Sequence, residues 1–288
     1  MVNLGLIGNI YHMKSYIEKA YELPQINIAG KSITETGSKN EDYSLPIPEY
    51  SRIELVKYVD ALFINRFSSL SFQLLSDIIK ESKPFFAASY PDLSPEECVQ
   101  LSKLAREAQT IIQVANPFLY LPSVQWLNQN LKKPAYIDVA LSKKEEEKFE
   151  DLLVKMLLML KEMTDGKPKK IKAIFFEMKS ENEVFRNINL EYGDGSIVNF
   201  NIKYSANQEE FIIKTFARDQ FTSFDMINTL GTCNNSAVNL PVSAQYNEVS
   251  AFFDTISGSK IQHTSLDDYS AASQTVKTIT SRLNKYVH

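Results

Sequence analysis

The chain of 288 residues is long enough for about two domains. Hydrophobic residues make up 44% of it and charged residues 23%, which excludes a disordered chain. The net charge is −4 without a sustained basic stripe, and no apolar run reaches the roughly 18 residues that span a bilayer, so we expect neither nucleic-acid nor membrane binding. The two cysteines are too far apart in sequence to indicate a disulfide framework, and three histidines do not form a metal-binding motif. The N-terminus has no basic signal segment, so we expect a cytoplasmic location.

In the first part of the chain, short apolar runs alternate with helical patterns. The predicted strands are the runs at 4–7, 26–29, 61–64, 84–88 and 111–114. Two of the intervening helices have clear start signals, because Ser51 with Glu54, and Ser94 with Pro95 and Glu97, form capping boxes. Strands that alternate with helices predict a doubly wound parallel sheet of Rossmann type.

After residue 117 the pattern changes. We expect a connecting helix over 118–131, a strand over 135–140 and a long helix capped by Ser142 and Glu145. Beyond Gly166 the strand signals follow one another, with a hairpin around Gly193-Asp194-Gly195. The remaining predictions are strands at 184–191, 196–204, 210–217 and 224–229 and helices at 243–257 and 266–286. The sequence therefore predicts an α/β Rossmann-type domain over 1–117 and an α+β domain with a mostly antiparallel sheet over 118–288.

Four stretches resemble the Gfo/Idh/MocA oxidoreductases, the family of glucose–fructose oxidoreductase and inositol dehydrogenase. The run Gly5-Leu6-Ile7-Gly8 resembles the start of a dinucleotide-binding unit, and Val59 to Ile64 resembles that family's third-strand entry. Lys83 to Val114 is similar in order and spacing to its strand–helix–strand unit around the E-K-P triplet. The late segment from Phe252 to Asp268 resembles its closing motif. The resemblance implies NAD or NADP as cofactor, a sugar-like ligand, and pairing of subunits through the open face of the second sheet.

The glycine loop that binds pyrophosphate in such folds is incomplete. Of the three glycines in G-x-G-x-x-G only Gly8 is present, since the other two positions hold Ile10 and Met13. We expect the Ile10 side chain to stand where pyrophosphate would lie, and Gly8 to be a turn glycine, although a helix N-terminus can still hold an anion. The second strand ends in Lys31 rather than the usual acid, and Lys31 is either a 2′-phosphate contact or a solvated lysine.

The catalytic positions implied by the resemblance are also altered. The E-K-P triplet falls on Ala88-Ser89-Tyr90 or, with a one-residue slip, on Ser89-Tyr90-Pro91, and either alignment lacks the lysine. The His and Asp of the second domain fall on Lys155 and Leu158. The expected Lys, His and Asp are therefore all absent. Tyr90 as a proton donor and Lys155 as a base are the candidates that remain, beside the alternative that both are structural. His12, just after the degenerate loop, either points into the cleft or is a structural residue in the first turn of a helix.

These departures favour a catalytically degenerate relative with a binding, regulatory or structural role, whose degenerate cleft holds Gly8, Ile10, Lys31 and Ser89. The alternatives are an active NAD(P)-dependent oxidoreductase acting on a sugar or cyclitol derivative with an atypical site, and an enzyme outside redox chemistry in the same cleft. We also expect a homodimer or higher homo-oligomer. The alternating apolar residues of the second sheet are the predicted contact face: Ile197, Phe200, Ile202, Phe211 and Ile213.

Overall fold

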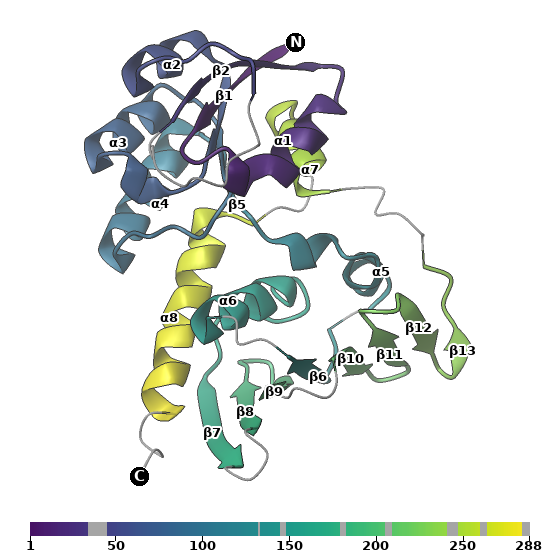
Figure 1. Cartoon of the computed structure of the whole chain (residues 1–288). Coiled ribbons are helices and arrows are strands. Elements are labelled where there is room, and N and C mark those ends of the chain that lie inside the picture. The colour runs from purple at the N-terminus through teal and green to yellow at the C-terminus, as the bar shows by residue number, and fades with distance from the viewer. Residues whose placement is uncertain are drawn as a thin grey trace. The chain divides into compact units, whose positions relative to one another are not determined.

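The computed structural model describes residues 1–33, 45–131, 133–144, 148–178, 183–204, 209–240, 247–259 and 264–283. They form two compact units (Figure 1). The first comprises Met1–Ala115 and Tyr246–Ser270, and the second comprises Asn116–Gln245 and Ala271–His288. Glu145, His263 and His288, which entered the sequence predictions, lie outside the described residues. In the described part of the chain no helix has the length and apolar character that a membrane span requires.

The first unit is built on a parallel five-stranded sheet, sheet A, with the order β2-β1-β3-β4-β5. Its strands are β1 (Val2–Ile7), β2 (Ile26–Ser32), β3 (Ala61–Ile64), β4 (Phe85–Ala87) and β5 (Ile112–Val114). Its helices are α1 (Lys14–Tyr21), α2 (Arg52–Tyr58), α3 (Phe72–Lys80), α4 (Pro95–Ala108) and α7 (Glu248–Ile256), with short 3-10 turns η1 (Tyr11–Met13) and η2 (Phe67–Ser69). The predicted Rossmann-type sheet and all five predicted strands are confirmed.

Both faces of sheet A are covered, as the fully buried short strands require. Helices α2, α3 and α4 pack on one face, around Leu62 and Phe85. On the other face α1 and α7 lie side by side over Phe63 and Phe86 (Figure 1). The predicted capping boxes are present: the Ser51 and Ser94 hydroxyls accept from the N3 backbone N–H groups of α2 and α4.

The second unit contains sheet B, which has eight strands in the order β13-β12-β11-β10-β6-β9-β8-β7. They are β6 (Tyr136–Lys143), β7 (Lys170–Met178), β8 (Glu183–Glu191), β9 (Ile197–Tyr204), β10 (Glu210–Phe216), β11 (Phe221–Asp225), β12 (Leu230–Cys233) and β13 (Ser236–Ala237). Only β6 and β9 pair in parallel, so the predicted mostly antiparallel sheet is confirmed. The helical elements that begin in this unit are η3 (Pro117–Tyr120), α5 (Pro122–Asn130) and α6 (Phe149–Met159), and α8 (Leu266–Leu283) enters it from the first unit.

Aromatic contacts show which face of sheet B the helices cover. Trp126 of α5 lies with its ring centroid 5.3 Å from that of Phe224 on β11. The guanidinium of Arg186 on β8 lies 4.3 Å from the ring centroid of Phe149 at the start of α6. Phe118 of η3 contacts Phe211 of β10 at 5.3 Å. Figure 1 shows α5 and α6 on this one side of the strands.

Several sequence predictions are wrong in this unit. Ser142 does not cap α6, because β6 continues to Lys143 and places Ser142 inside the strand, opposite Glu210. The strand predicted at 224–229 ends at Asp225, whose carboxylate accepts from the N–H groups of the turn that follows. The predicted contact face is also wrong in four of its five residues, because Phe200, Ile202, Phe211 and Ile213 are buried beneath the helices.

The two compact units divide the chain differently from the predicted limits 1–117 and 118–288. The segment Tyr246–Ser270 belongs with the first unit, although it follows the whole of sheet B in sequence. The physical reason is α7, whose residues Phe252 and Phe253 are buried against Phe63 of sheet A at ring-centroid distances of 6.0 Å. Sheet A therefore takes part of its core from a helix that follows the whole of sheet B in sequence.

This arrangement predicts a large stability effect from α7. Phe252→Ala is expected to lower the free energy of unfolding by about 3–5 kcal/mol, because it leaves a cavity among three buried rings. Denaturant unfolding followed by circular dichroism measures the effect. Tyr21→Ala is the matched control, since Tyr21 is 54% exposed and should change stability by about 0.5 kcal/mol at most. Equal effects of the two substitutions would contradict the role of α7.

Candidate functional site

The carboxyl ends of β1, β3 and β4 meet at one edge of sheet A, where Rossmann-type folds bind their ligands. Gly8 follows β1 with φ of +115°, and a Cβ at this position would lie 2.7 Å from the Cβ of Asn65, which follows β3. Only glycine suits such a backbone, so Gly8 is required by the turn and by this close approach. The Ser89 hydroxyl, after β4, donates to the Asn65 carbonyl oxygen. The structure thus brings together Gly8 and Ser89 of the predicted cleft, with Asn65 between them.

The loop that leads from β1 into α1 is closed by its own residues. The side-chain oxygen of Asn9 accepts from the backbone N–H of Tyr11 at 2.9 Å and from that of His12 at 3.3 Å. The Met13 N–H donates to the Ile10 carbonyl oxygen and the Gly8 N–H donates to that of Ser32. A pyrophosphate would need bare N–H groups at this point, and those of Tyr11 and His12 are already bonded.

Ile10 and Met13 lie in the core rather than in the cleft. Ile10 is 8% exposed and Met13 is fully buried, both in the cluster between sheet A and the helices α1 and α7. The expectation that the Ile10 side chain occupies the pyrophosphate position is therefore wrong. Its side chain turns inward because η1 places it against the apolar face of the sheet. The residue that sequence reasoning missed is Asn9, although asparagine before a helical turn is a recognised capping signal.

Lys31, the second predicted cofactor residue, is held by a neighbouring segment. Its ammonium donates to the carbonyl oxygen of Leu45 at 2.9 Å, and its backbone pairs with Pro48 and Tyr50. The Tyr50 ring covers Gly30 so closely that a Cβ there would lie 2.6 Å from the ring. The segment 45–50 thus follows the outer edge of β2, and the Lys31 ammonium serves to hold it in place.

The two catalytic candidates lie in separate units. Tyr90 packs at the edge of the α2–α4 core, and its ring stacks on that of Tyr269 with centroids 5.5 Å apart and planes 22° apart. Lys155 is half-buried on α6 in the second unit, and the next turn holds Leu158, which is 1% exposed. The described contacts give Tyr90 a packing role. His12 is exposed beside Tyr11, with ring centroids 6.1 Å apart.

A polar pair of the half-buried Tyr16 and the buried Glu248 joins α1 to α7. The Tyr16 hydroxyl is hydrogen-bonded to the side chain of Glu248, which is only 5% exposed and lies in the first turn of α7. Burial, and then the negative charge of Glu248, raise the pKa of Tyr16 far above its usual value of 10.0. Gln113 of β5 donates to the Glu248 carbonyl oxygen at 2.8 Å. No sequence signal links these residues, because their contact depends on α7 returning to sheet A.

Among the described residues, no group of three or more His, Cys, Asp or Glu side chains is placed to hold a metal ion. Cys98 is buried and Cys233 is half-buried, and neither takes part in a disulfide. The carboxyl edge of sheet A carries the amide and hydroxyl groups of Asn9, Asn65 and Ser89, with the exposed side chains of His12 and Arg66 in the same connections.

No protein-family model and no curated protein sequence matches the chain. Solved structures with the same fold are found among dehydrogenases. A UDP-N-acetylglucosamine 3-dehydrogenase from Acidithiobacillus ferrooxidans is 16% identical, with a TM-score of 0.78 over 100% of this chain and 99% of that one. An oxidoreductase from Agrobacterium radiobacter in complex with NAD+, L-tartaric acid and magnesium is 11% identical, with a TM-score of 0.78 over 99% and 97% of the two chains.

A third structure is a biliverdin reductase from Synechocystis in complex with biliverdin and NADP+. It is 14% identical, with a TM-score of 0.72 over 98% of this chain and 99% of that one. At these identities the likeness concerns the fold. It confirms the predicted fold, in which a Rossmann-type part is combined with an α+β part that has a mostly antiparallel sheet.

The Asn9 bonds predict a specific stability effect. Asn9→Ala is expected to lower the free energy of unfolding by about 1 kcal/mol, because the N–H groups of Tyr11 and His12 lose their acceptor. Asn9→Asp keeps an acceptor oxygen and should retain the stability of the parent chain. Thermal unfolding of the three proteins measures the difference, and a loss in Asn9→Asp as large as in Asn9→Ala would contradict the capping role.

The Tyr16–Glu248 pair predicts a pH dependence. Because the pKa of Tyr16 is higher in the folded chain than its usual value of 10.0, its contribution is fully present below pH 10 and is lost as the pH rises above that value. Tyr16→Phe removes this contribution. The difference in unfolding free energy between the two proteins, measured by urea unfolding at several pH values, should therefore shrink above pH 10. A difference that grows with pH would contradict the assignment.

Proposed function

We propose that this chain is an oxidoreductase-like protein of the Gfo/Idh/MocA fold that no longer carries out dinucleotide chemistry and has a binding, regulatory or structural role. The observation that supports this most directly is the closed loop, in which the Asn9 side-chain oxygen accepts hydrogen bonds from the N–H groups of Tyr11 and His12. The residues present do not fit a dinucleotide, so we derive no step through NAD or NADP.

Two further observations support the proposal. The Lys31 ammonium is bonded to the Leu45 carbonyl oxygen rather than presented as an isolated cation, and the second strand carries no acid for the ribose. The Tyr90 ring is stacked on Tyr269, and Leu158 occupies the position of the family's Asp. We propose a small, sugar-like molecule as the ligand, because the amide and hydroxyl groups at this edge suit sugar hydroxyls. We also propose a cytoplasmic location, which suits two cysteines that form no disulfide.

The test is a fluorescence titration with NADH and NADPH. Loss of two charge-assisted hydrogen bonds at about 1.5–3 kcal/mol each weakens binding by two or more orders of magnitude, so no saturation is expected at micromolar concentrations. Asn9→Gly frees the two N–H groups and should tighten binding, whereas the matched variant Asn9→Asp should not. Micromolar affinity of the parent chain would overturn the proposal in favour of an active NAD(P)-dependent oxidoreductase on a sugar or cyclitol derivative, with Tyr90 and Lys155 as its candidate residues.

We propose in addition that the chain forms a homodimer through the open face of sheet B. This face, opposite α5 and α6, carries large apolar side chains that remain accessible: Ile174 and Phe176 are each 57% exposed and Phe216 is 44% exposed. Exposed apolar residues on one sheet face are typical of a contact surface. Ile197, which the sequence analysis predicted for this face, lies on it beside Tyr136.

The centre of the open face is polar and suits a two-fold contact. Asp138 Oδ1 accepts from the side-chain amides of Asn199 at 2.8 Å and Asn201 at 3.0 Å. Asn187 donates to the side-chain oxygens of both asparagines. Carboxamides carry donors and acceptors together, so this cluster can face a copy of itself across a symmetry axis.

Phe176→Lys is expected to shift the chain from dimer to monomer in sedimentation equilibrium, because it places a charge in the apolar part of the contact. Ile53→Lys is the matched control, since Ile53 is 62% exposed on α2 and lies outside sheet B. A parent chain that stays monomeric at micromolar concentration would refute the dimer, and an equal effect of both substitutions would refute this face.

A further inference from the structure

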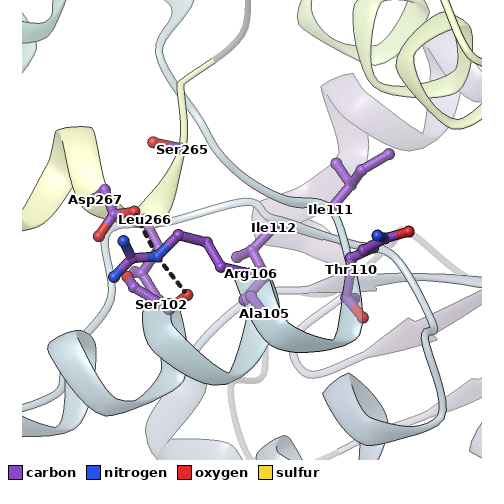
Figure 2. A pocket seen from close by; sticks show the side chains of 10 residues that line it. Ser102, Ala105, Arg106, Thr110, Ile111, Ile112, Ser265, Leu266 and Asp267 are labelled. Atoms are coloured by element: carbon purple, nitrogen blue, oxygen red, sulfur yellow. Dashed lines mark hydrogen bonds and ion pairs between the residues drawn. The ribbon is translucent and has the colours of Figure 1, made fainter.

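A pocket of about 220 Å³ opens at the opposite edge of sheet A from the candidate site (Figure 2). It lies between the last turns of α4, the residues that lead into β5 and the first turn of α8. Thr110 to Ile112 enter β5, whereas Gly8, Asn65 and Ser89 follow the carboxyl ends of their strands. In a parallel sheet these are opposite edges, so the pocket is independent of the loop at Asn9.

The floor of the pocket is apolar. Ile112 and Leu266 are 5% and 2% exposed, and Ala105 on α4 is 8% exposed. The small side chain of Ala105 leaves the room that a longer residue on this helix face would fill. A volume of about 220 Å³ lies below the ~300–1,000 Å³ of pockets for drug-sized ligands, so it suits a molecule the size of an amino acid.

Opposite charges stand at the mouth of the pocket. The Arg106 Nε of α4 lies 3.8 Å from the Asp267 carboxylate of α8, and both side chains are more than half exposed. Figure 2 shows Arg106 reaching across from α4 toward Asp267. At 3.8 Å the two groups form an ion pair but no hydrogen bond, so each retains capacity to bind a further partner.

A buried hydroxyl in the pocket wall gives an independent sign of a missing partner. Ser102, one turn before Arg106, lines the pocket and is only 3% exposed. In the described structure its Oγ has no hydrogen-bond partner. Buried hydroxyls are normally paired, because an unpaired one loses its hydration without compensation. A polar ligand group bound beside Arg106, one turn further along α4, would supply that partner.

From these features we infer a second ligand site, for a small zwitterion such as an α-amino acid with an aliphatic side chain. The ligand carboxylate binds the Arg106 guanidinium, its ammonium binds the Asp267 carboxylate, and its side chain lies on Ile112 and Leu266. An arginine presents paired N–H donors that match a carboxylate, and the aspartate beside it selects for a cationic group. The ligand thereby joins α4 to the start of α8.

The test uses the full chain and L-leucine as the probe, by isothermal titration calorimetry. We expect saturable binding with Kd of about 1 mM or tighter. Arg106→Gln and Asp267→Asn should each weaken it roughly tenfold or more, the effect of losing one charge-assisted contact. Lys103→Gln is the matched control, because Lys103 lies on α4 outside the pocket and pairs with Glu107. It should leave binding unchanged.

Two further arms separate the outcomes. Ala105→Met fills the pocket while keeping both charges, and it should abolish binding without altering the secondary structure. The carboxylate 4-methylpentanoate and the amine isopentylamine should each bind at least about tenfold more weakly than L-leucine. Absence of saturable L-leucine binding, equal binding of the amine-free acid, or equal effects of Lys103→Gln and Arg106→Gln would overturn the inference. None of these results depends on whether the chain binds a dinucleotide.

Discussion

The hydrogen bonds from the Tyr11 and His12 N–H groups to the Asn9 side chain decide what the carboxyl edge of sheet A can bind. A loop between a first strand and first helix binds phosphate only when its N–H groups face outward without partners. Here a side chain of the loop itself satisfies them, and the turn that results sends Ile10 and Met13 into the core. Ile10 and Met13 are buried between the sheet and the helices and anchor the loop to the hydrophobic core, while Tyr11 and His12 between them stay exposed. The Asn9 hydrogen bonds and the burial of Ile10 and Met13 are thus parts of one local structure.

The same core depends on a segment from the far end of the sequence. Phe252 lies against Phe63 and Phe86 at ring-centroid distances of 6.0 and 5.9 Å, and the buried contact between Tyr16 and Glu248 joins α7 to α1. A hydrogen-bonded pair in an apolar setting tolerates little displacement, because separating it leaves buried polar groups without partners. We therefore regard α7 as the element that fixes the position of α1 and of the loop before it.

Much of the fold could be predicted from the sequence because its signals are local. The strands of sheet A are short apolar runs that are buried on both faces, and the capping boxes at Ser51 and Ser94 need only residues within one turn. The false cap at Ser142 shows the limit of such signals. A serine at the right spacing lies inside a strand here, because pairing with β10 reaches Ser142 and pairing with β9 continues to Lys143.

The errors at the candidate site and contact face have tertiary causes. Alternation in β9 and β10 separates two faces but does not say which one the helices cover, and the more apolar set packs inward. Likewise, Ile10 could be identified as a departure from the glycine pattern, but the direction of its side chain follows from η1 and from the core that receives it. The role of Asn9 was accessible as a capping signal, whereas that of Glu248 required knowledge of where α7 lies.

The most direct test of the closed loop is amide hydrogen exchange of Tyr11 and His12, measured by NMR in the parent chain and in Asn9→Ala. If Asn9 holds both N–H groups, they should exchange slowly in the parent chain and much faster in Asn9→Ala, while the Met13 N–H, bonded to Ile10, keeps its protection in both. Exchange of Tyr11 and His12 in the parent chain as fast as in Asn9→Ala would show that their N–H groups are free, and would contradict the account.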